Sequence, residues 1–119
     1  MMERVEGIGV DVCSIGRVED ALAKHGPRFV TRVLRPEEVE DAMPAAKLAR
    51  RWALKEAVAK ALGSGIGGAV GFQDIALGHT EAGAPTVTVR GHEDKHFMAS
   101  VSDDAGVAVA MVVVITPEA

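Results

Sequence analysis

Residues 51–68 read RWALKEAVAKALGSGIGG, a run of strong helix formers that ends in a cluster of glycines. The pattern predicts a long helix over 45–62, with Gly63 as its stop signal. The helix carries charged residues in two pairs spaced four apart, so that each pair shares one side: Arg51 with Lys55, and Glu56 with Lys60. A carboxylate that could bind a metal and cations that could bind phosphate therefore lie on one helix, although such pairs are commonly plain surface charge.

The glycines after this helix predict a loop that lets backbone approach a ligand closely. Their N–H groups could face an anion: Gly63, Gly65, Gly67 and Gly68. The loop is not a Walker motif, since no Gly-Lys-Ser/Thr follows it, and it is not the dinucleotide fingerprint, whose glycines precede a helix. The alternative is a flexible connection between a helix and a strand.

The segment VEGIGVDVCS, 5–14, predicts a β-strand with two unlike faces. Side chains alternate along it: Ile8, Val10 and Val12 point one way, and Gly7, Gly9 and Asp11 point the other. Because glycine in a strand often marks a close approach, we expect something to lie against the second face. Asp11 could hold a hard cation such as Mg²⁺ there, or it could cap the turn after the strand.

The rest of the chain carries ordinary helix and strand signals. A helix is predicted from the N-cap Ser14 to about His25, closed by Gly26 and Pro27, and another begins near Pro36. Half-buried strands are predicted over 72–79 and 86–90, a buried strand over 107–115, and a short helix or loop over 92–97. We therefore expect a single α+β domain over 1–119, with a mostly antiparallel sheet in its C-terminal half.

The composition limits the class of protein. The formal net charge is -4 and aromatic residues make up 3% of the chain, which argues against a nucleic-acid partner. Neither a signal peptide nor a membrane-spanning apolar run is visible, so we expect a cytoplasmic protein with no membrane partner. The single cysteine, Cys13, permits no internal disulfide. Residues 24–35 hold four cations and no acid, which indicates an acidic ligand or partner, or ordinary solvated surface.

Two stretches carry a resemblance that no single signal would support. They are GIGVDVCSIGR at 7–17 and RWALKEAVAKALGSGIG at 51–67, with supporting segments at 28–34, 71–75 and 83–85. Together they resemble the holo-[acyl-carrier-protein] synthases, which are short, single-domain 4′-phosphopantetheinyl transferases. The resemblance implies the fold of that family and a homotrimer with sites at its subunit interfaces. It also implies transfer of the phosphopantetheine arm of coenzyme A to a serine of an apo acyl carrier protein, with release of 3′,5′-ADP.

The resemblance also implies roles for individual residues. Asp11 and Glu56 would bind Mg²⁺, and these two residues and Lys60 would be catalytic. Lys60 would contact phosphate oxygens and could protonate the departing one, while either Glu56 or a water held by the metal would take the serine proton. The residues implied in coenzyme A binding are Arg51, Lys60, Gly63, Gly65, Gly67, Pro85 and Asp103. Those implied in docking the acidic helix of the carrier protein are Arg17, Arg28, Phe29 and Arg32.

Asp103 departs from the family pattern. In SVSDDAGVAVA, 100–110, it stands where the family has a His that reaches the nucleotide phosphates. An anion near a pyrophosphate is unfavourable unless a cation lies between them. Asp103 would then add a metal ligand, turn to solvent in a weakened enzyme, or mark a non-transferring relative. Such a relative would bind coenzyme A or a carrier protein as an accessory module, or would run another reaction in the same cleft. The sequence does not distinguish fatty-acid biosynthesis from a specialised lipid pathway.

Overall fold

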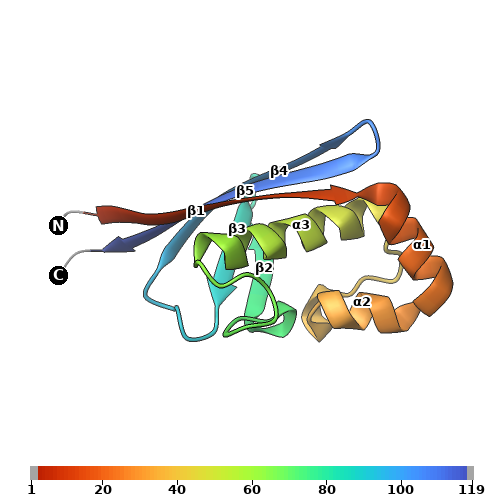
Figure 1. The fold of residues 1–119 in the computed structure, drawn as a ribbon, viewed down its shortest axis with the longest axis horizontal. Coiled ribbons are helices and arrows are strands. Elements are labelled where there is room, and N and C mark those ends of the chain that lie inside the picture. Colours follow the sequence, from red (N-terminus) through yellow and green to blue (C-terminus); the bar gives the residue numbers. More distant parts are fainter. Residues whose placement is uncertain (1–2, 118–119) are drawn as a thin grey trace.

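A computed structural model describes residues 3–117 and shows the predicted α+β fold. A three-stranded antiparallel sheet in the order β1-β5-β4 is covered on one face by helix α3, and a separate hairpin forms the two-stranded sheet β2-β3 (Figure 1). The strands are β1 (Glu3–Ser14), β2 (Ile75–His79), β3 (Pro85–Val89), β4 (His96–Asp104) and β5 (Val107–Pro117). The helices are α1 (Ile15–His25), α2 (Pro27–Val33) and α3 (Ala45–Ala61), with single 3-10 turns η1 (Pro36–Glu38) and η2 (Phe72–Asp74).

The glycine face of β1 serves helix packing. A Cβ atom on Gly9 would lie 2.0 Å from the carbonyl oxygen of Ala57, and one on Gly7 would lie 2.1 Å from that of Ala61. The helix contributes small residues to the same contact, all of them buried and spaced by four: Ala49, Ala53, Ala57 and Ala61. The expected close approach is therefore confirmed, and the segment that approaches is α3, whose backbone lies against the strand.

The opposite face of the same sheet is apolar and open. Ile8 and Val12 are each 61% exposed, and further large apolar side chains of β4 and β5 are exposed as well: Met98, Val107, Val109 and Met111. Figure 1 shows α3 below this sheet and no other element of residues 3–117 above it. The prediction of a fully buried strand over 107–115 is wrong, because in β5 only alternate side chains face α3.

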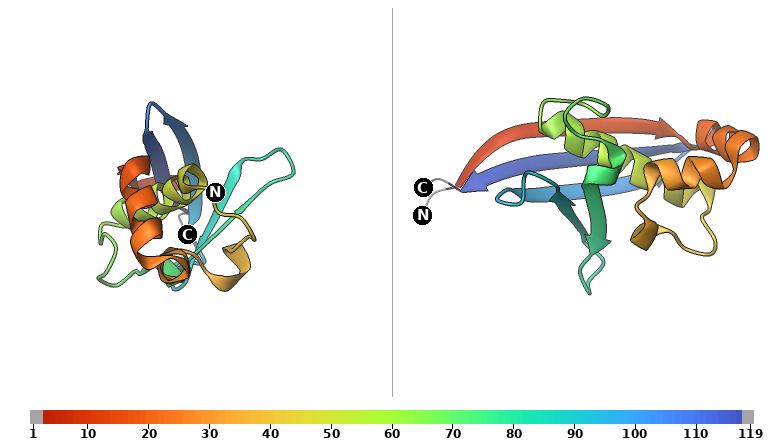
Figure 2. Two further views of the ribbon diagram at one scale, coloured as in Figure 1. Left: turned by 90° about the vertical axis from the view of Figure 1, so that its right-hand side faces the viewer. Right: turned by 90° about the horizontal axis from the view of Figure 1, so that it is seen from below.

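Other elements differ from expectation in detail. α1 begins at the predicted cap, where the Ser14 side chain accepts a hydrogen bond from the Arg17 amide at 3.2 Å. α2 and β4 were not predicted, and the segment over 72–79 divides into η2 and β2. The β4–β5 hairpin turns through two left-handed residues, Ala105 and Gly106. The β2–β3 hairpin projects away from the larger sheet (Figure 2).

A buried ion pair fixes this hairpin to α3. Lys55, predicted on a charged stripe with Arg51, is instead fully buried and donates to Glu38 Oε1 at 2.7 Å and to the Phe72 carbonyl at 3.1 Å. Glu38 Oε2 accepts the Leu77 amide of β2 at 2.6 Å. Burial lowers the pKa of Lys55, and the hydrogen bond that Lys55 donates to Glu38 opposes this shift. The pair therefore sets where β2 lies relative to α3.

Candidate active site

Three of the predicted catalytic residues meet at the edge of the sheet formed by β1. Lys60 Nζ donates to Asp11 Oδ1 at 2.9 Å and to the Val10 carbonyl at 3.1 Å. Glu56 lies one helical turn before Lys60 on α3, and its charge interacts with that of Asp11. We call Asp11, Glu56 and Lys60 the carboxylate cluster. Residues from two motifs far apart in the chain are thus brought together as the sequence indicated.

The electrostatics of the carboxylate cluster favour a further cation. Burial raises the pKa of Glu56, and the nearby charge of Asp11 raises it further, while Lys60 opposes the shift. The hydrogen bond to Asp11 raises the pKa of Lys60, so this side chain stays charged at neutral pH. A charged Lys60 suits contact with phosphate oxygens, and donation of its proton to the departing oxygen stays a prediction.

The donor set of this cluster fits a hard metal ion that keeps several waters. Asp11 and Glu56 offer only carboxylate oxygens, which Mg²⁺ prefers. Within residues 3–117, no group of three or more His, Cys, Asp and Glu side chains could enclose a metal. An ion at Asp11 and Glu56 would therefore have coordination positions left for water and for phosphate oxygens of a substrate.

A second group of predicted residues lies beside the other edge strand, β4. A cavity of about 250 Å³ is lined on α3 by Lys47, Arg50 and Arg51 and on the β2–β3 hairpin by Gly78, His79 and Pro85, together with other residues. We call these six residues the basic pocket. Two residues expected to bind coenzyme A, Arg51 and Pro85, are brought together here. Lys47 and Arg50 were missed, and their signal is the helical spacing of Lys47, three residues before Arg50 and four before Arg51.

Two carboxylates pair with the cations of the basic pocket. Arg50 Nη1 donates to Asp103 Oδ1 at 2.7 Å. Glu40 pairs with Lys47 and lies 3.9 Å from Arg51 Nη2, and the hydrogen bond from Lys47 lowers the pKa of Glu40. Asp103 therefore has a cationic partner, Arg50, within the chain, and the three alternatives named for Asp103 stay predictions.

One chain does not bring the two groups together. Asp11 pairs with Ala110 of β5, and Asp103 of β4 pairs with Ala108 of β5, so the two carboxylates lie on opposite edge strands. Strands are spaced by about 4.8 Å, which puts β1 and β4 roughly 10 Å apart across the sheet. The residues predicted to form one active site therefore fall into two parts.

Three glycine amides of the loop after α3 donate hydrogen bonds within the chain. The amides of Gly63, Gly65 and Gly67 donate to the carbonyls of Lys60, Ala59 and Val70 at 2.9, 3.2 and 3.0 Å, respectively. All three glycines have positive φ values, between 67° and 100°. These three amides are therefore occupied within the chain, and glycine is needed here for the turn itself, while the hypothesis of an anion cradle, which also includes Gly68, stays a prediction. Contact between these residues and a nucleotide stays a prediction.

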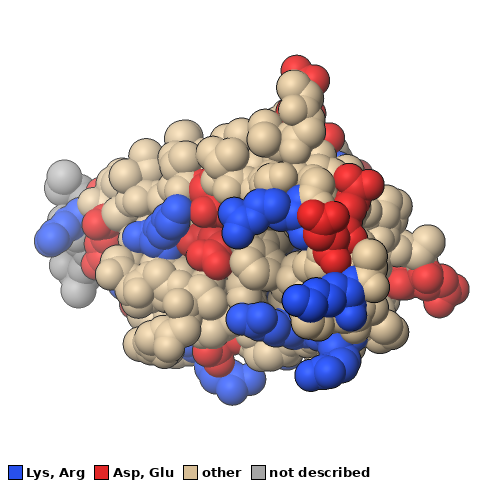
Figure 3. Space-filling model, turned by 45° about the vertical axis from the view of Figure 1, so that its right-hand side comes forward, with Lys and Arg blue, Asp and Glu red and all other residues tan. Residues whose placement is uncertain are grey.

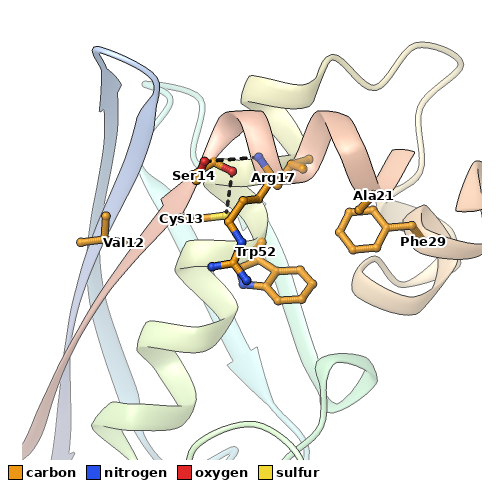
Figure 4. A pocket seen from close by; sticks show the side chains of 8 residues that line it. Val12, Cys13, Ser14, Arg17, Ala21, Phe29 and Trp52 are labelled. Carbon is orange, nitrogen blue, oxygen red and sulfur yellow. Dashed lines mark hydrogen bonds between the residues drawn. The ribbon is translucent and has the colours of Figure 1, made fainter. Parts of the chain in front are cut away.

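The predicted carrier-docking residues lie together on α1 and α2. A cavity of about 240 Å³ is lined by Val12, Cys13, Ser14, Arg17, Val18, Ala21, Phe29 and Trp52 (Figure 4). Phe29 is mostly buried and stacks on Trp52 with ring centroids 5.5 Å apart. Arg28 and Arg32 line an adjoining shallow pocket with Phe29. Figure 3 shows basic side chains gathered towards this end, with carboxylates between them.

The length and hydropathy of the helices bear on the predicted absence of a membrane partner. Within residues 3–117, no helix is both long and apolar enough to cross a membrane.

The free thiol of Cys13 is buried, and burial raises its pKa, so it is a weak nucleophile.

Known proteins share the sequence and the fold of this chain. A family model of the 4′-phosphopantetheinyl transferase superfamily matches residues 7–112. The holo-[acyl-carrier-protein] synthase of Nitratiruptor is 43% identical, over 91% of this chain and 97% of that protein. The crystal structure of the Neisseria meningitidis synthase has a TM-score of 0.84 at 35% identity, covering 93% of this chain and 98% of that one. The Helicobacter pylori synthase in complex with coenzyme A has a TM-score of 0.81 at 36% identity, covering 90% and 98%. The chain therefore belongs to the 4′-phosphopantetheinyl transferase superfamily and is a relative of the holo-[acyl-carrier-protein] synthases.

Proposed function

We propose that this protein is a Mg²⁺-dependent holo-[acyl-carrier-protein] synthase. It transfers the 4′-phosphopantetheine arm of coenzyme A to a serine of an apo acyl carrier protein and releases 3′,5′-ADP. The observation that carries the proposal is the carboxylate cluster, in which Asp11 and Glu56 converge beside Lys60. The relatives at about 40% identity favour this activity over a non-transferring module. A cytoplasmic site of action in fatty-acid biosynthesis is part of the same proposal.

The reaction exchanges one P–O bond for another. The serine oxygen of the carrier attacks the phosphorus that bears the pantetheine arm, the bond from that phosphorus to the bridging oxygen breaks, and 3′,5′-ADP leaves with that oxygen. The serine proton would pass to a base, either Glu56 or a water molecule. Asp11 and Glu56 would hold Mg²⁺, whose chemistry when bound is to neutralise and orient the pyrophosphate. Lys60, charged and half exposed, is placed to contact the phosphate oxygens once it leaves Asp11.

We propose further that the active site is completed between subunits of a homotrimer. The open face of the β1-β5-β4 sheet exposes a continuous set of large apolar side chains, which monomeric proteins rarely do. The carboxylate cluster and the basic pocket lie beside opposite edges of this sheet. If the cluster of one subunit faces the basic pocket of the next, a single coenzyme A can reach both. The nucleotide would lie in the basic pocket, and its pyrophosphate would reach the cluster.

The carrier protein would dock on α1 and α2. Arg17, Arg28 and Arg32 supply positive charge for an acidic partner. The cavity that Phe29 and Trp52 help to line supplies an apolar centre. Arg28→Glu should raise KM for the carrier about tenfold, with KM for coenzyme A unchanged, because the charge complementarity is reversed. The matched control is Arg4→Glu, an exposed arginine at the far end of β1, which should leave both constants unchanged.

The transferase is tested by intact-mass analysis of an apo carrier protein. The carrier is incubated with this protein, coenzyme A and Mg²⁺, and a parallel sample contains EDTA. We expect a gain of one phosphopantetheine mass that EDTA abolishes. No gain with several carrier proteins, while the protein is folded and binds coenzyme A, would contradict the transferase and favour the accessory module.

A further inference from the structure

The two residues of the Arg50–Asp103 ion pair lie on a helix and on a strand. Arg50 lies on α3 and Asp103 lies on β4, where it is in register with Ala108 of the central strand. The contact of 2.7 Å is short for a hydrogen bond between charged groups, and each side chain is about one third exposed. The backbones of both residues are held by regular secondary structure.

Arg50 has donors to spare in this arrangement. Within residues 3–117, its side chain makes one hydrogen bond, from Nη1 to Asp103. A guanidinium group has five N–H donors in a fixed plane, so a bond at one nitrogen orients the others. Because Arg50 also lines the basic pocket, Asp103 sets the direction in which its remaining donors can face an anion there.

Glu40 is the second carboxylate of the same pocket, and it lies outside the helices and strands. It follows η1 in an irregular segment, its side chain is half exposed, and it contacts Lys47 while lying 3.9 Å from Arg51. Such an exposed pair contributes little and can open at low cost. Glu40 therefore neutralises the pocket, whereas Asp103 also holds a cation in place.

We propose that Asp103 is a positioning residue, which fixes the Arg50 guanidinium so that it binds a phosphate of the nucleotide in the basic pocket. The ligand named here rests on the proposed function. Charge alone would make Asp103 unfavourable beside a phosphate, as it would Glu40. Orientation acts in the opposite direction, because an ordered guanidinium loses less rotamer freedom when the ligand binds.

The opposite signs of these two effects give a direct test. Isothermal titration calorimetry would measure binding of 3′,5′-ADP to the assembled wild-type protein and to Asp103→Asn, Glu40→Gln, Arg50→Ala and the double variant Arg50→Ala/Asp103→Asn. We expect Asp103→Asn to weaken binding about fivefold, since the oriented charge-assisted contact is lost. Glu40→Gln should tighten binding about twofold, since only a competing charge is removed.

The double variant shows whether Asp103 acts through Arg50. In the Arg50→Ala background, loss of the Asp103 charge should no longer weaken binding. Equal or tighter binding by Asp103→Asn than by the wild type would overturn the proposal, because Asp103 would then behave as Glu40 does. An equal loss with and without Arg50 would overturn it too. A wild-type protein that is folded and binds no 3′,5′-ADP would instead contradict the proposed function.

Discussion

The two edges of the larger sheet are built for charges of opposite sign. At β1, the carboxylate cluster places two acids beside one lysine, and the pKa of Glu56 is raised by burial and then by the charge of Asp11. Beside β4, the basic pocket gathers Lys47, Arg50 and Arg51, whose carboxylate partners among the described residues are Glu40 and Asp103. The first edge suits a cation and the second suits phosphate. A nucleotide pyrophosphate with its metal ion needs both, which is why we infer that two subunits share one site.

The largest effect is expected at the carboxylate cluster. Glu56→Gln should lower kcat by about a hundredfold or more, because one of the two carboxylates for the metal is removed. The same change should not destabilise the fold at neutral pH. The pKa of Glu56 is raised in the folded protein, so the ionised carboxylate costs stability at pH values above that pKa. The cost disappears at low pH, where Glu56 is protonated in both the folded and the unfolded protein.

Thermal unfolding at several pH values checks this sign. At neutral pH, Tm of Glu56→Gln should equal or exceed that of the wild type, and the difference should shrink as pH falls towards the ordinary glutamate value of 4.5. A kcat close to that of the wild type would contradict the metal assignment. A lower Tm at neutral pH would contradict the electrostatic account.

The next largest effect is expected on the open face of the sheet. Met111→Arg places a charge at the centre of β5, where the side chain is 46% exposed, and should convert the proposed trimer to monomers. The rate of phosphopantetheine transfer should fall by a factor of several tens, because the carboxylate cluster of one subunit would no longer face the basic pocket of the next. Light scattering and a transfer assay measure both results. Thr88→Arg, at an exposed position of the smaller sheet, is the control and should change neither.

A smaller effect is expected at the basic pocket. Arg51→Ala should raise KM for coenzyme A about tenfold and leave kcat within a factor of a few, because a nucleotide contact binds the ground state and transition state alike. Steady-state kinetics with saturating carrier protein measure the split. A large fall in kcat with unchanged KM would assign Arg51 to the reacting phosphate. It would contradict the assignment of nucleotide binding to the basic pocket and of catalysis to the carboxylate cluster.

The smallest change tests how α3 supports both edges. Gly9→Ala introduces a Cβ that would lie 2.0 Å from the Ala57 carbonyl oxygen, and should destabilise the fold by about 1–3 kcal/mol. Gly16→Ala is the control, because its Cβ would lie 3.7 Å from the nearest side-chain atom, Ser14 Oγ. Chemical denaturation should show a loss at the first position only. Equal stability of both variants would contradict the close packing of α3 on β1.

The carboxylate cluster was predictable because its residues lie in two short motifs with regular spacing. Asp11 sits on an alternating strand, and Glu56 and Lys60 share one helical face. The second edge was harder to predict, because β4 reads HFMASVSDD and ends in polar residues that hide its alternation. Lys55 could not be distinguished from a surface lysine, since its partner Glu38 lies 17 residues earlier, in the short 3-10 turn η1.

The open face shows a different limit of sequence reasoning. Alternation in β1 correctly separated Ile8, Val10 and Val12 from the glycines. The glycines predicted a close approach on their own face, and α3 makes that approach. Alternation could not predict that the apolar face stays exposed, because burial of valines inside one chain is the usual expectation.

The shared active site is tested most directly by mixing two defective subunits. Glu56→Gln damages the carboxylate cluster, and Arg51→Glu reverses a charge in the basic pocket. The two variants would be co-expressed with different tags, and the mixed oligomers purified and assayed at limiting coenzyme A. If each site combines the edges of two neighbours, every mixed trimer has one intact site of three, so the purified mixed oligomers should show about a third of wild-type transfer. Mixed oligomers no more active than either variant alone would contradict the account, because each site would then lie within one chain.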